Sequence, residues 1–335
     1  MRTILFLIQA IVLLCSLGSC DIGLGSVGSN TPPPFLPPSI YDWTFQNSGT
    51  EVDLYGVFFI DNNYGWVVGE SQTVLVTSNS GQTWPQAPST AKDSDLRSVF
   101  IVDSQTGWIT GESEENTTNG YVFKSSMGGA YPTLQYAAEG SLNTVAFLNQ
   151  DVGWAAGAGS TLLHTSNGGF NWTMGTIGSD LIIFDLHFFD EELGWSVTDA
   201  GIYRTKDGAS WQAEDETTAW SLRAIHFVDT LHGWACGDNN TIMRREINGN
   251  NEVIWTRSSI EDEPGSMVWN DIFFIDTQSG WVVGNTGRIH KTVDGGRSWS
   301  LELTGLLTNI NSIYMVSSTN GWIVGDDGAI LTYTP

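Results

Sequence analysis

The sequence has few cysteines, few methionines, few basic residues and one long apolar run. Of 335 residues, three are Cys, six are Met and 13 are Lys or Arg, against 37 Asp or Glu, for a formal net charge of −24. Such an acidic surface repels phosphate backbones, so we expect no nucleic-acid partner. By contrast, the chain holds 38 glycines and 15 tryptophans. This composition favours a turn-rich, β-rich chain over a helical one.

The long apolar run stands near the N-terminus, from Ile4 to Leu14, directly after the basic Arg2. It is too short to cross a bilayer and has the layout of a signal peptide. Leu17-Gly18-Ser19-Cys20 follows and resembles a bacterial lipobox. We therefore predict a signal peptide over residues 1–19 and a lipid on Cys20. The lipid would hold the exported protein on the bacterial cell envelope, at a periplasmic face or at the cell surface. An ordinary signal peptide with an incidental cysteine is the alternative.

Residues 20–40 are predicted to form a tether, because Asp21 to Ser39 is rich in Gly, Ser and Pro. Cys15 belongs to the signal and Cys20 would carry the lipid, which leaves Cys236 alone. A single thiol forms no internal disulfide, so we expect packing to hold the fold and Cys236 to be a small buried residue.

Residues 41–335 contain seven copies of one repeat, each marked by the pair Gly-Trp. The tryptophans of these pairs are Trp66, Trp108, Trp154, Trp195, Trp234, Trp281 and Trp322. Their spacing of roughly 40 to 47 residues is that of a four-stranded propeller blade. A short alternating run such as Leu142 to Phe147 precedes each pair and indicates an innermost strand. The sequence therefore predicts an all-β, seven-bladed β-propeller with four-stranded blades.

A second signature joins the third and fourth strands of several blades. It reads Thr-Ser-Asn-Gly-Gly-Phe-Asn-Trp at 165–172 and Thr-Val-Asp-Gly-Gly-Arg-Ser-Trp at 292–299, with looser copies at 77–84, 205–211 and 125–131. The Asn or Asp accepts from turn N–H groups, and Gly takes a positive φ. We predict hairpin capping rather than metal binding, with structural roles for Trp84, Trp172, Trp211 and Trp299. The signature resembles the Asp-box of sialidase-type propellers.

The two chain ends predict how the ring closes. The seventh repeat runs to Leu331-Thr332-Tyr333-Thr334-Pro335 without an Asp-box or a fourth strand, whereas Trp43-Thr44 resembles the start of a fourth strand, as in Trp172-Thr173. We predict that residues 41–48, with Trp43 as a structural residue, complete the last blade and join it to the first.

Two sets of positions are expected around one end of the central channel. The start of each innermost strand and the turn after each Gly-Trp strand share that end, because the strands of a blade alternate in direction. The candidate binding residues are Arg97, Asn143, Arg223, Asn270 and Asn311 from the first set, and Glu70, Glu112, Asp199, Asp238 and Asp326 from the second. They would form a docking face for a polar ligand or a protein partner. The alternative is that turns at a wet surface are simply polar.

Other candidates favour structure over chemistry. His187 and His226 occupy the inner-strand slot that holds Phe58, Phe100, Phe273 and Tyr314 elsewhere, so we expect core or channel-lining residues rather than a catalytic or metal pair. Insertions at 112–120 and 244–252 are long loops that either make contacts or tolerate drift. Ca²⁺ binding by the glutamates of the first loop has no ligand spacing in its favour.

The repeated Gly-Trp motif and the Asp-boxes over residues 41–335 resemble the photosystem II stability/assembly factor-like propellers. This resemblance implies a non-catalytic scaffold that engages protein partners through a basic, arginine-rich patch. In this chain, Arg97 and Arg223 are the arginines expected near the channel mouth.

A carbohydrate-active enzyme is the competing hypothesis, because sialidases and related glycosidases also use Asp-box propellers. Such a site needs an arginine cluster with a Glu–Tyr pair, or two carboxylates about 5 to 9.5 Å apart. Asp185 and Asp271 are the nearest approach to such a pair, and blade five is expected to separate them. We therefore predict no catalytic residues, no cofactor and no metal. The expected partners are the membrane, through the lipid, and a protein or a glycan.

Overall fold

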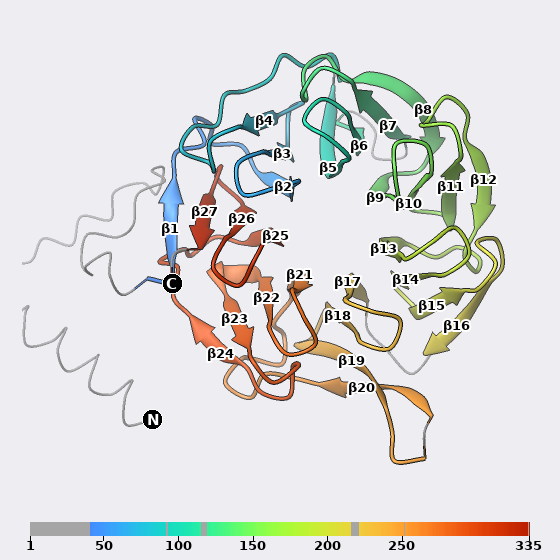
Figure 1. Cartoon of the computed structure of the whole chain (residues 1–335), viewed down its shortest axis with the longest axis vertical. Helices are drawn as coiled ribbons and strands as arrows, with labels where there is room; N and C mark the ends of the chain where they lie inside the picture. Colours follow the sequence, from blue (N-terminus) through green and yellow to red (C-terminus); the bar gives the residue numbers. More distant parts are fainter. Residues whose placement is uncertain (1–40, 92, 115–118, 216–220, 251, 334) are drawn as a thin grey trace, which may run out of the picture.

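A computed structural model describes residues 41–335 apart from 92, 115–118, 216–220, 251 and 334. The predicted signal peptide, the lipidated Cys20 and the tether lie outside the described residues. Seven antiparallel sheets stand around a central axis like the blades of a propeller (Figure 1), which confirms the predicted fold. The described residues contain no helix long and apolar enough to cross a membrane.

Each blade runs from an innermost strand at the axis to an outermost strand at the rim. Blade one consists of β2 (Leu54–Phe59), β3 (Gly65–Gly69) and β4 (Val74–Thr77). Blade two consists of β5 (Ser94–Ile101), β6 (Gly107–Ser113), β7 (Asn119–Ser125) and β8 (Thr133–Glu139). Blade three consists of β9 (Leu142–Phe147), β10 (Gly153–Gly157), β11 (Thr161–Thr165) and β12 (Thr173–Thr176). Blade four consists of β13 (Ile183–Phe188), β14 (Gly194–Thr198), β15 (Gly201–Thr205) and β16 (Trp211–Asp215). Blade five consists of β17 (Leu222–Phe227), β18 (Gly233–Gly237), β19 (Thr241–Ile247) and β20 (Val253–Ser258). Blade six consists of β21 (Trp269–Phe274), β22 (Gly280–Gly284), β23 (Ile289–Thr292) and β24 (Ser300–Glu302). Blade seven consists of β25 (Ile310–Met315), β26 (Gly321–Gly325), β27 (Ile330–Tyr333) and β1 (Trp43–Gln46).

Blade one differs from the prediction, because its sheet has three strands. The segment in the place of the fourth strand makes a single bridge, Leu75 to Gln86, through the N–H of Val76 to the Pro85 carbonyl and the N–H of Ala87 to the Val74 carbonyl. Pro85 and Pro88 flank this bridge and lack the N–H groups that a longer ladder needs.

The Gly-Trp motif has a direct packing reason. The buried tryptophan of one blade stacks flat on a ring at the end of the next blade's innermost strand. Five junctions share this arrangement, with centroid distances of 3.6 Å for Trp322–Phe59 and Trp234–Phe274, 3.7 Å for Trp108–Phe147 and Trp154–Phe188, and 4.3 Å for Trp195–Phe227. The preceding glycine makes room for that ring within its own blade: a Cβ on Gly153 would lie 2.4 Å from the Phe147 ring.

The Asp-box tryptophans complete a three-ring stack. Trp84, Trp172, Trp211 and Trp299 each meet the same phenylalanine of their own blade edge-on, at 5.7 to 6.1 Å between centroids. The boxes themselves are capped as hairpins. In blade four, backbone N–H groups of Ser210 and Ala209 donate to Asp207 and lower its pKa to about 2. The described residues contain no group of three or more His, Cys, Asp or Glu side chains that could hold a metal ion.

The N-terminal strand closes the ring, as predicted. Strand β1 pairs antiparallel with β27, with Trp43 opposite Tyr333, so the first and last described strands lie side by side in Figure 1. Behind them, Trp43 Nε1 donates to Glu302 at 2.8 Å, and the Tyr333 hydroxyl donates to the same carboxylate at 3.0 Å. These two buried hydrogen bonds connect the closing strand to blade six as well as to blade seven.

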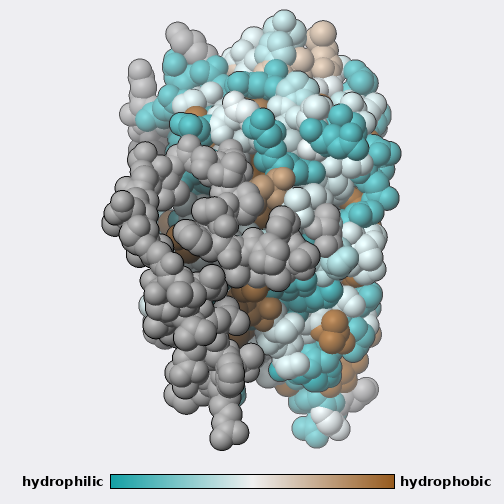
Figure 2. All heavy atoms as spheres, turned by 90° about the vertical axis from the view of Figure 1, so that its left-hand side faces the viewer, coloured by the Kyte–Doolittle hydropathy of each residue, from teal (hydrophilic) through white to brown (hydrophobic). Residues whose placement is uncertain are grey.

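The blade-five insertion extends β19 and β20 into a hairpin that stands out from the ring (Figure 1). Where coloured residues are visible from the rim at β1, hydrophilic residues predominate and apolar residues form small separate patches (Figure 2). The core therefore lies within and between the blades.

Deleting residues 41–48 should greatly destabilise the fold, because the buried Trp43 and the whole β1–β27 ladder are lost and an open strand edge is left. We expect a loss of at least about 3 kcal/mol, as for removal of one buried Trp. Urea unfolding followed by tryptophan fluorescence measures it. Deletion of residues 29–36 in the predicted tether is the matched control and should leave the midpoint unchanged. Equal midpoints for both deletions would contradict the closure.

Candidate functional site

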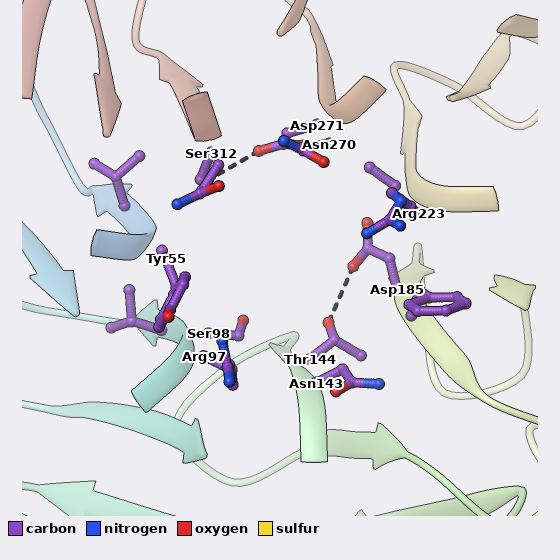
Figure 3. A pocket seen from close by; sticks show the side chains of 16 residues that line it. Tyr55, Arg97, Ser98, Asn143, Thr144, Asp185, Arg223, Asn270, Asp271 and Ser312 are labelled. Carbon is purple, nitrogen blue, oxygen red and sulfur yellow. Dashed lines mark hydrogen bonds between the residues drawn. The ribbon is translucent and has the colours of Figure 1, made fainter. Parts of the chain in front are cut away.

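One end of the channel carries a concave, polar site that we call the channel mouth. It has a volume of about 150 Å³ and is lined by the start of every innermost strand (Figure 3). The seven equivalent residues are Tyr55, Arg97, Asn143, Phe184, Arg223, Asn270 and Asn311. The structure therefore brings together all five candidates from the first predicted set.

The second predicted set lies directly behind the first, in the same blades. Five of the seven blades join a mouth residue to the residue 15 positions later: Tyr55 to Glu70 at 2.8 Å, Arg97 to Glu112, Arg223 to Asp238 at 2.7 Å, Asn270 to Asn285 at 3.1 Å and Asn311 to Asp326 at 2.9 Å. Blade three has Ala158 at this position, and Asp199 of blade four accepts instead from the backbone N–H of Ile182. The mouth is therefore a double ring of polar side chains.

The two arginines stand in equivalent surroundings. Arg97 lies over the Tyr55 ring at 4.2 Å, and Arg223 lies over the Phe184 ring at 6.0 Å. Each arginine thus stacks on an aromatic ring of the preceding blade and pairs with a carboxylate of its own blade, Glu112 or Asp238. Both are partly exposed. Arg223 reaches Asp238 through Nε at 2.7 Å, and its side chain lines the mouth.

The three asparagines have a different part, which the sequence did not reveal. Their amide nitrogens donate to a backbone carbonyl of the next blade at 2.9 Å: Asn143 to Ile183, Asn270 to Ile310 and Asn311 to Leu54. These side chains therefore join neighbouring blades at the mouth, and the arginines and carboxylates are the groups that remain for a ligand.

Comparison with known proteins assigns the family. A family model described as photosynthesis system II assembly factor YCF48 matches residues 38–116, 204–300 and 246–334, more than half of the chain. The chain belongs to the YCF48 family. Its similarity to photosystem II stability/assembly factors, which the repeats indicated, is thereby confirmed.

Two curated relatives of this family are similar along most of the chain. Photosystem II stability/assembly factor HCF136 of rice (Oryza sativa subsp. japonica) is 25% identical over 70% of the chain, and photosystem II assembly lipoprotein Ycf48 of Synechococcus sp. (strain CC9902) is 24% identical over 74%. The matched region spans 49% and 57% of these relatives' own lengths.

Solved structures agree on the fold. YCF48 bound to D1 peptide superposes with a TM-score of 0.71 at 21% identity, over 92% of this chain and 100% of that one. YCF48 from Cyanidioschyzon merolae gives 0.70 at 20% identity, over 88% and 99%. The WD40 propeller domain of Doa1 gives 0.67 at 14% identity, over 87% and 97%, so the YCF48 fold is also that of WD40 propellers.

Two partly buried carboxylates, Asp185 and Asp271, also line the mouth of this YCF48-family propeller (Figure 3). Asp185 accepts from the Thr144 hydroxyl of blade three at 3.0 Å and from the Ile225 N–H of blade five at 3.0 Å. Asp271 accepts from the Ser312 hydroxyl and the Ile313 N–H of blade seven at 3.0 and 2.9 Å. Burial raises their pKa values, to about 6 for Asp185 and about 7 for Asp271. Both carboxylates therefore bind neighbouring blades together and have their oxygens occupied.

Deeper in the channel, six side chains form an open series of aromatic contacts around the axis. Centroid distances are 4.6 Å for Phe100–Phe58, 4.7 Å for Phe58–Tyr314, 5.2 Å for Tyr314–Phe273, 4.3 Å for Phe273–His226 and 5.5 Å for His226–His187. Burial lowers the pKa of His187 to about 3 and of His226 to about 4. The two histidines are therefore neutral channel-lining residues, in line with the slot they occupy. Cys236 is a buried free thiol.

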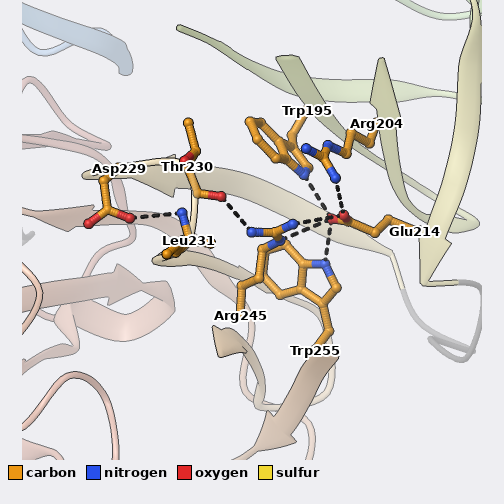
Figure 4. Close-up of polar contacts among 8 residues, drawn as sticks. All are labelled: Trp195, Arg204, Glu214, Asp229, Thr230, Leu231, Arg245 and Trp255. Carbon is orange, nitrogen blue, oxygen red and sulfur yellow. Dashed lines mark hydrogen bonds and ion pairs between the residues drawn. The ribbon is translucent and has the colours of Figure 1, made fainter. Parts of the chain in front are cut away.

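A separate polar cluster lies between blades four and five, away from the mouth (Figure 4). Glu214 accepts from the indole N–H of Trp195 at 2.7 Å and of Trp255 at 3.1 Å. It also pairs with Arg245 at 3.0 Å and Arg204 at 3.3 Å, and the Arg245 side chain is only 2% exposed. Glu214 of blade four thus joins Arg245 and Trp255 of blade five.

Asp185 and Asp271 make the free energy of unfolding depend on pH. Because their pKa values are raised in the folded chain, their contribution is fully present below about pH 4, the unfolded pKa, and is lost as pH rises toward 6 to 7. The free energy of unfolding should fall by about 1 kcal/mol per pH unit per group in that window. Asp271→Asn should flatten this slope in urea titrations at successive pH values. Asp199→Asn, at an exposed turn, should leave it unchanged, and equal slopes for the two variants would refute the assignment.

Glu214→Gln should destabilise the protein by about 3 kcal/mol, because it leaves the buried Arg245 guanidinium without its counter-charge. Glutamine keeps the shape and an acceptor oxygen, so the loss reports on charge. Glu246→Gln removes the more exposed partner of Arg244 and should cost no more than about 1 kcal/mol. Thermal or urea unfolding of both variants distinguishes the two pairs, and the reverse order would contradict the account.

Proposed function

We propose that this chain is a non-catalytic, membrane-tethered scaffold whose channel mouth binds a polypeptide segment of a protein partner. The observation that carries the proposal is the pair of arginine–aromatic–carboxylate units at the mouth, Arg97 with Tyr55 and Arg223 with Phe184 (Figure 3). A guanidinium offers several donors in one plane, which suits carbonyl and carboxylate groups of a peptide. The rings beside them add apolar contact for side chains.

The comparisons support a polypeptide as the ligand class. The curated relatives are named as photosystem II assembly factors, and a solved YCF48 propeller is bound to D1 peptide. The Synechococcus relative is named as a lipoprotein, which supports the lipid on Cys20 and an exported, envelope-anchored location. The chain matches about half the length of these relatives. For this reason the class of partner is proposed for this chain and is not transferred from them.

The proposed mouth differs from the broad basic patch that the family resemblance implies. Its two arginines are each already paired with a carboxylate, and the chain carries 37 acidic against 13 basic residues. A ligand would therefore gain from a few directed hydrogen bonds to the arginines rather than from a wide positive field. This favours a short, polar segment over a strongly acidic one.

The glycosidase alternative finds little support in the arrangement. Its best carboxylate pair, Asp185 and Asp271, lines the mouth, but the oxygens of both carboxylates already accept hydrogen bonds from neighbouring blades. A general acid and a nucleophile need oxygens that can reach a substrate. We therefore propose that the mouth binds without turnover.

The double variant Arg97→Gln/Arg223→Gln should lose partner binding, because both guanidinium groups are removed while the side chains stay polar. The measurement is quantitative co-purification of the full-length lipidated chain from detergent-solubilised membranes of the native host, with cross-linking mapped to the mouth. Arg297→Gln, which makes the same substitution once in the Asp-box of blade six, is the control; it should retain the partner, and each single mouth variant is compared with it at equal charge. Equal recovery from both variants would overturn the mouth as the binding site. Glycan-array binding with turnover would overturn the proposal of a scaffold.

A further inference from the structure

All Asp-box hairpins lie at the end of the propeller opposite the channel mouth. In blade three, Asn143 lines the mouth, whereas Phe147 pairs with Gly153 at the other end of the strands, and Gly153 pairs with Thr165, where the Asp-box begins. The same register holds in blade six, from Phe274 to Gly280 to Thr292. We call this end the Asp-box face.

The Asp-box face carries an array of exposed apolar side chains. Phe170 is 83% exposed, Val293 71% and Met127 61%, each within the hairpin between the third and fourth strands of a different blade. Tyr131 is half exposed in the same hairpin as Met127. Among the described residues at the mouth end, Leu307 is as exposed as Phe170 and Ile182 is 39% exposed, both in connections between blades. The exposed apolar tips of the Asp-box hairpins, by contrast, all lie on one face.

The chain enters the propeller on this same face. In blade seven, Trp43 pairs with Tyr333, and the neighbouring Thr332 pairs with Trp322. Strand β1 therefore begins at the Gly321 end of the blade and runs toward the mouth. If residues 20–40 form the predicted tether, a coil of that length would span roughly 25 Å from Cys20 to Tyr41. That reach is close to the height of strands of five or six residues with their turns. A lipid on Cys20 would therefore hold the bilayer near the Asp-box face.

We infer that the Asp-box face lies on the lipid surface, with Phe170, Val293 and Met127 at the interface and the channel mouth directed away from the membrane. This inference rests on the membrane tether of the proposed function. Three scattered apolar tips are too few to hold a protein on a bilayer alone, but they can orient one that is already anchored.

The charge on this face indicates the kind of lipid. Asp294 stands in the same hairpin as Val293, and Asp207 stands in the Asp-box of blade four; hydrogen bonds lower their pKa values to about 2, so both are ionised at neutral pH. The turns after the innermost strands lie on the same face and add Asp61, Asp103, Asp151, Asp190, Asp229 and Asp276. Carboxylates therefore outnumber the Asp-box cations Lys206 and Arg297, and anionic head groups would be repelled. The occupant is therefore a zwitterionic lipid surface.

Fluorescence quenching tests the orientation in the full lipidated chain. Phe170→Cys, Val293→Cys and Leu307→Cys, labelled singly with an environment-sensitive fluorophore, are bound to phosphatidylcholine vesicles that contain a nitroxide lipid. Cys236 is buried, so the introduced thiol takes the label. We expect several-fold stronger quenching at 170 and 293 than at 307, the equally exposed site at the mouth end. Adding Met127→Asp and Val293→Asp to the labelled 170 variant should reduce its quenching without loss of vesicle flotation.

The outcomes separate the two ideas. If the chain does not float with the vesicles, the tether fails and the orientation falls with it. If it floats and all three sites are quenched equally, or Leu307→Cys most strongly, the orientation is wrong while the scaffold proposal stands. Unchanged quenching after Met127→Asp and Val293→Asp would likewise overturn the contribution of the apolar tips.

Discussion

The stack of a Gly-Trp tryptophan on the phenylalanine of the next blade is the interaction on which this structure depends. It recurs at five of the seven junctions, and a further tryptophan meets each phenylalanine edge-on. Flat aromatic surfaces of this size bury much apolar area and fix the distance between blades. Glycine before the tryptophan follows from the same contact, because a Cβ there would enter the phenylalanine ring. The most visible motif of the sequence is thus the record of one packing requirement.

Ring closure reuses a junction that the fold already contains. Glu302 accepts from Trp43 and Tyr333 between blades six and seven, as Glu214 accepts from Trp255 and Arg245 between blades four and five. Both glutamates stand three residues after an Asp-box tryptophan, and each faces a third strand and a fourth strand of the next blade. The N-terminal segment therefore needs no special device to complete the last blade. It supplies the Trp that an ordinary fourth strand supplies elsewhere.

The sequence predicted the features that depend on local pattern. Seven Gly-Trp pairs predicted seven blades, and Trp43-Thr44 predicted the closing strand, because each motif reports on its own strand. The mouth arginines were also predicted, since their place at a strand start fixes their end of the channel. The roles of Asp185, Asp271 and the three mouth asparagines were not, because their partners lie in neighbouring blades, 40 to 41 residues away for Asn143, Asp185 and Asp271 and 257 residues away for Asn311. The prediction of a fourth strand in blade one was wrong, although Pro85 and Pro88 indicated that a full strand would not form there.

The separation of Trp43 from its partner also has a consequence for how the protein is made. The contact between Trp43 and Glu302 joins residues 259 positions apart, and β1 pairs with the last strand of the chain. During synthesis or export from the N-terminus, β1 has no ladder to join until Ile330 to Tyr333 have emerged. Contacts of such long range form slowly, because a large loop must close first. The connectivity therefore sets the order of assembly. Blades one to six can assemble in turn, whereas β1, which emerges before them, is among the last strands to pair.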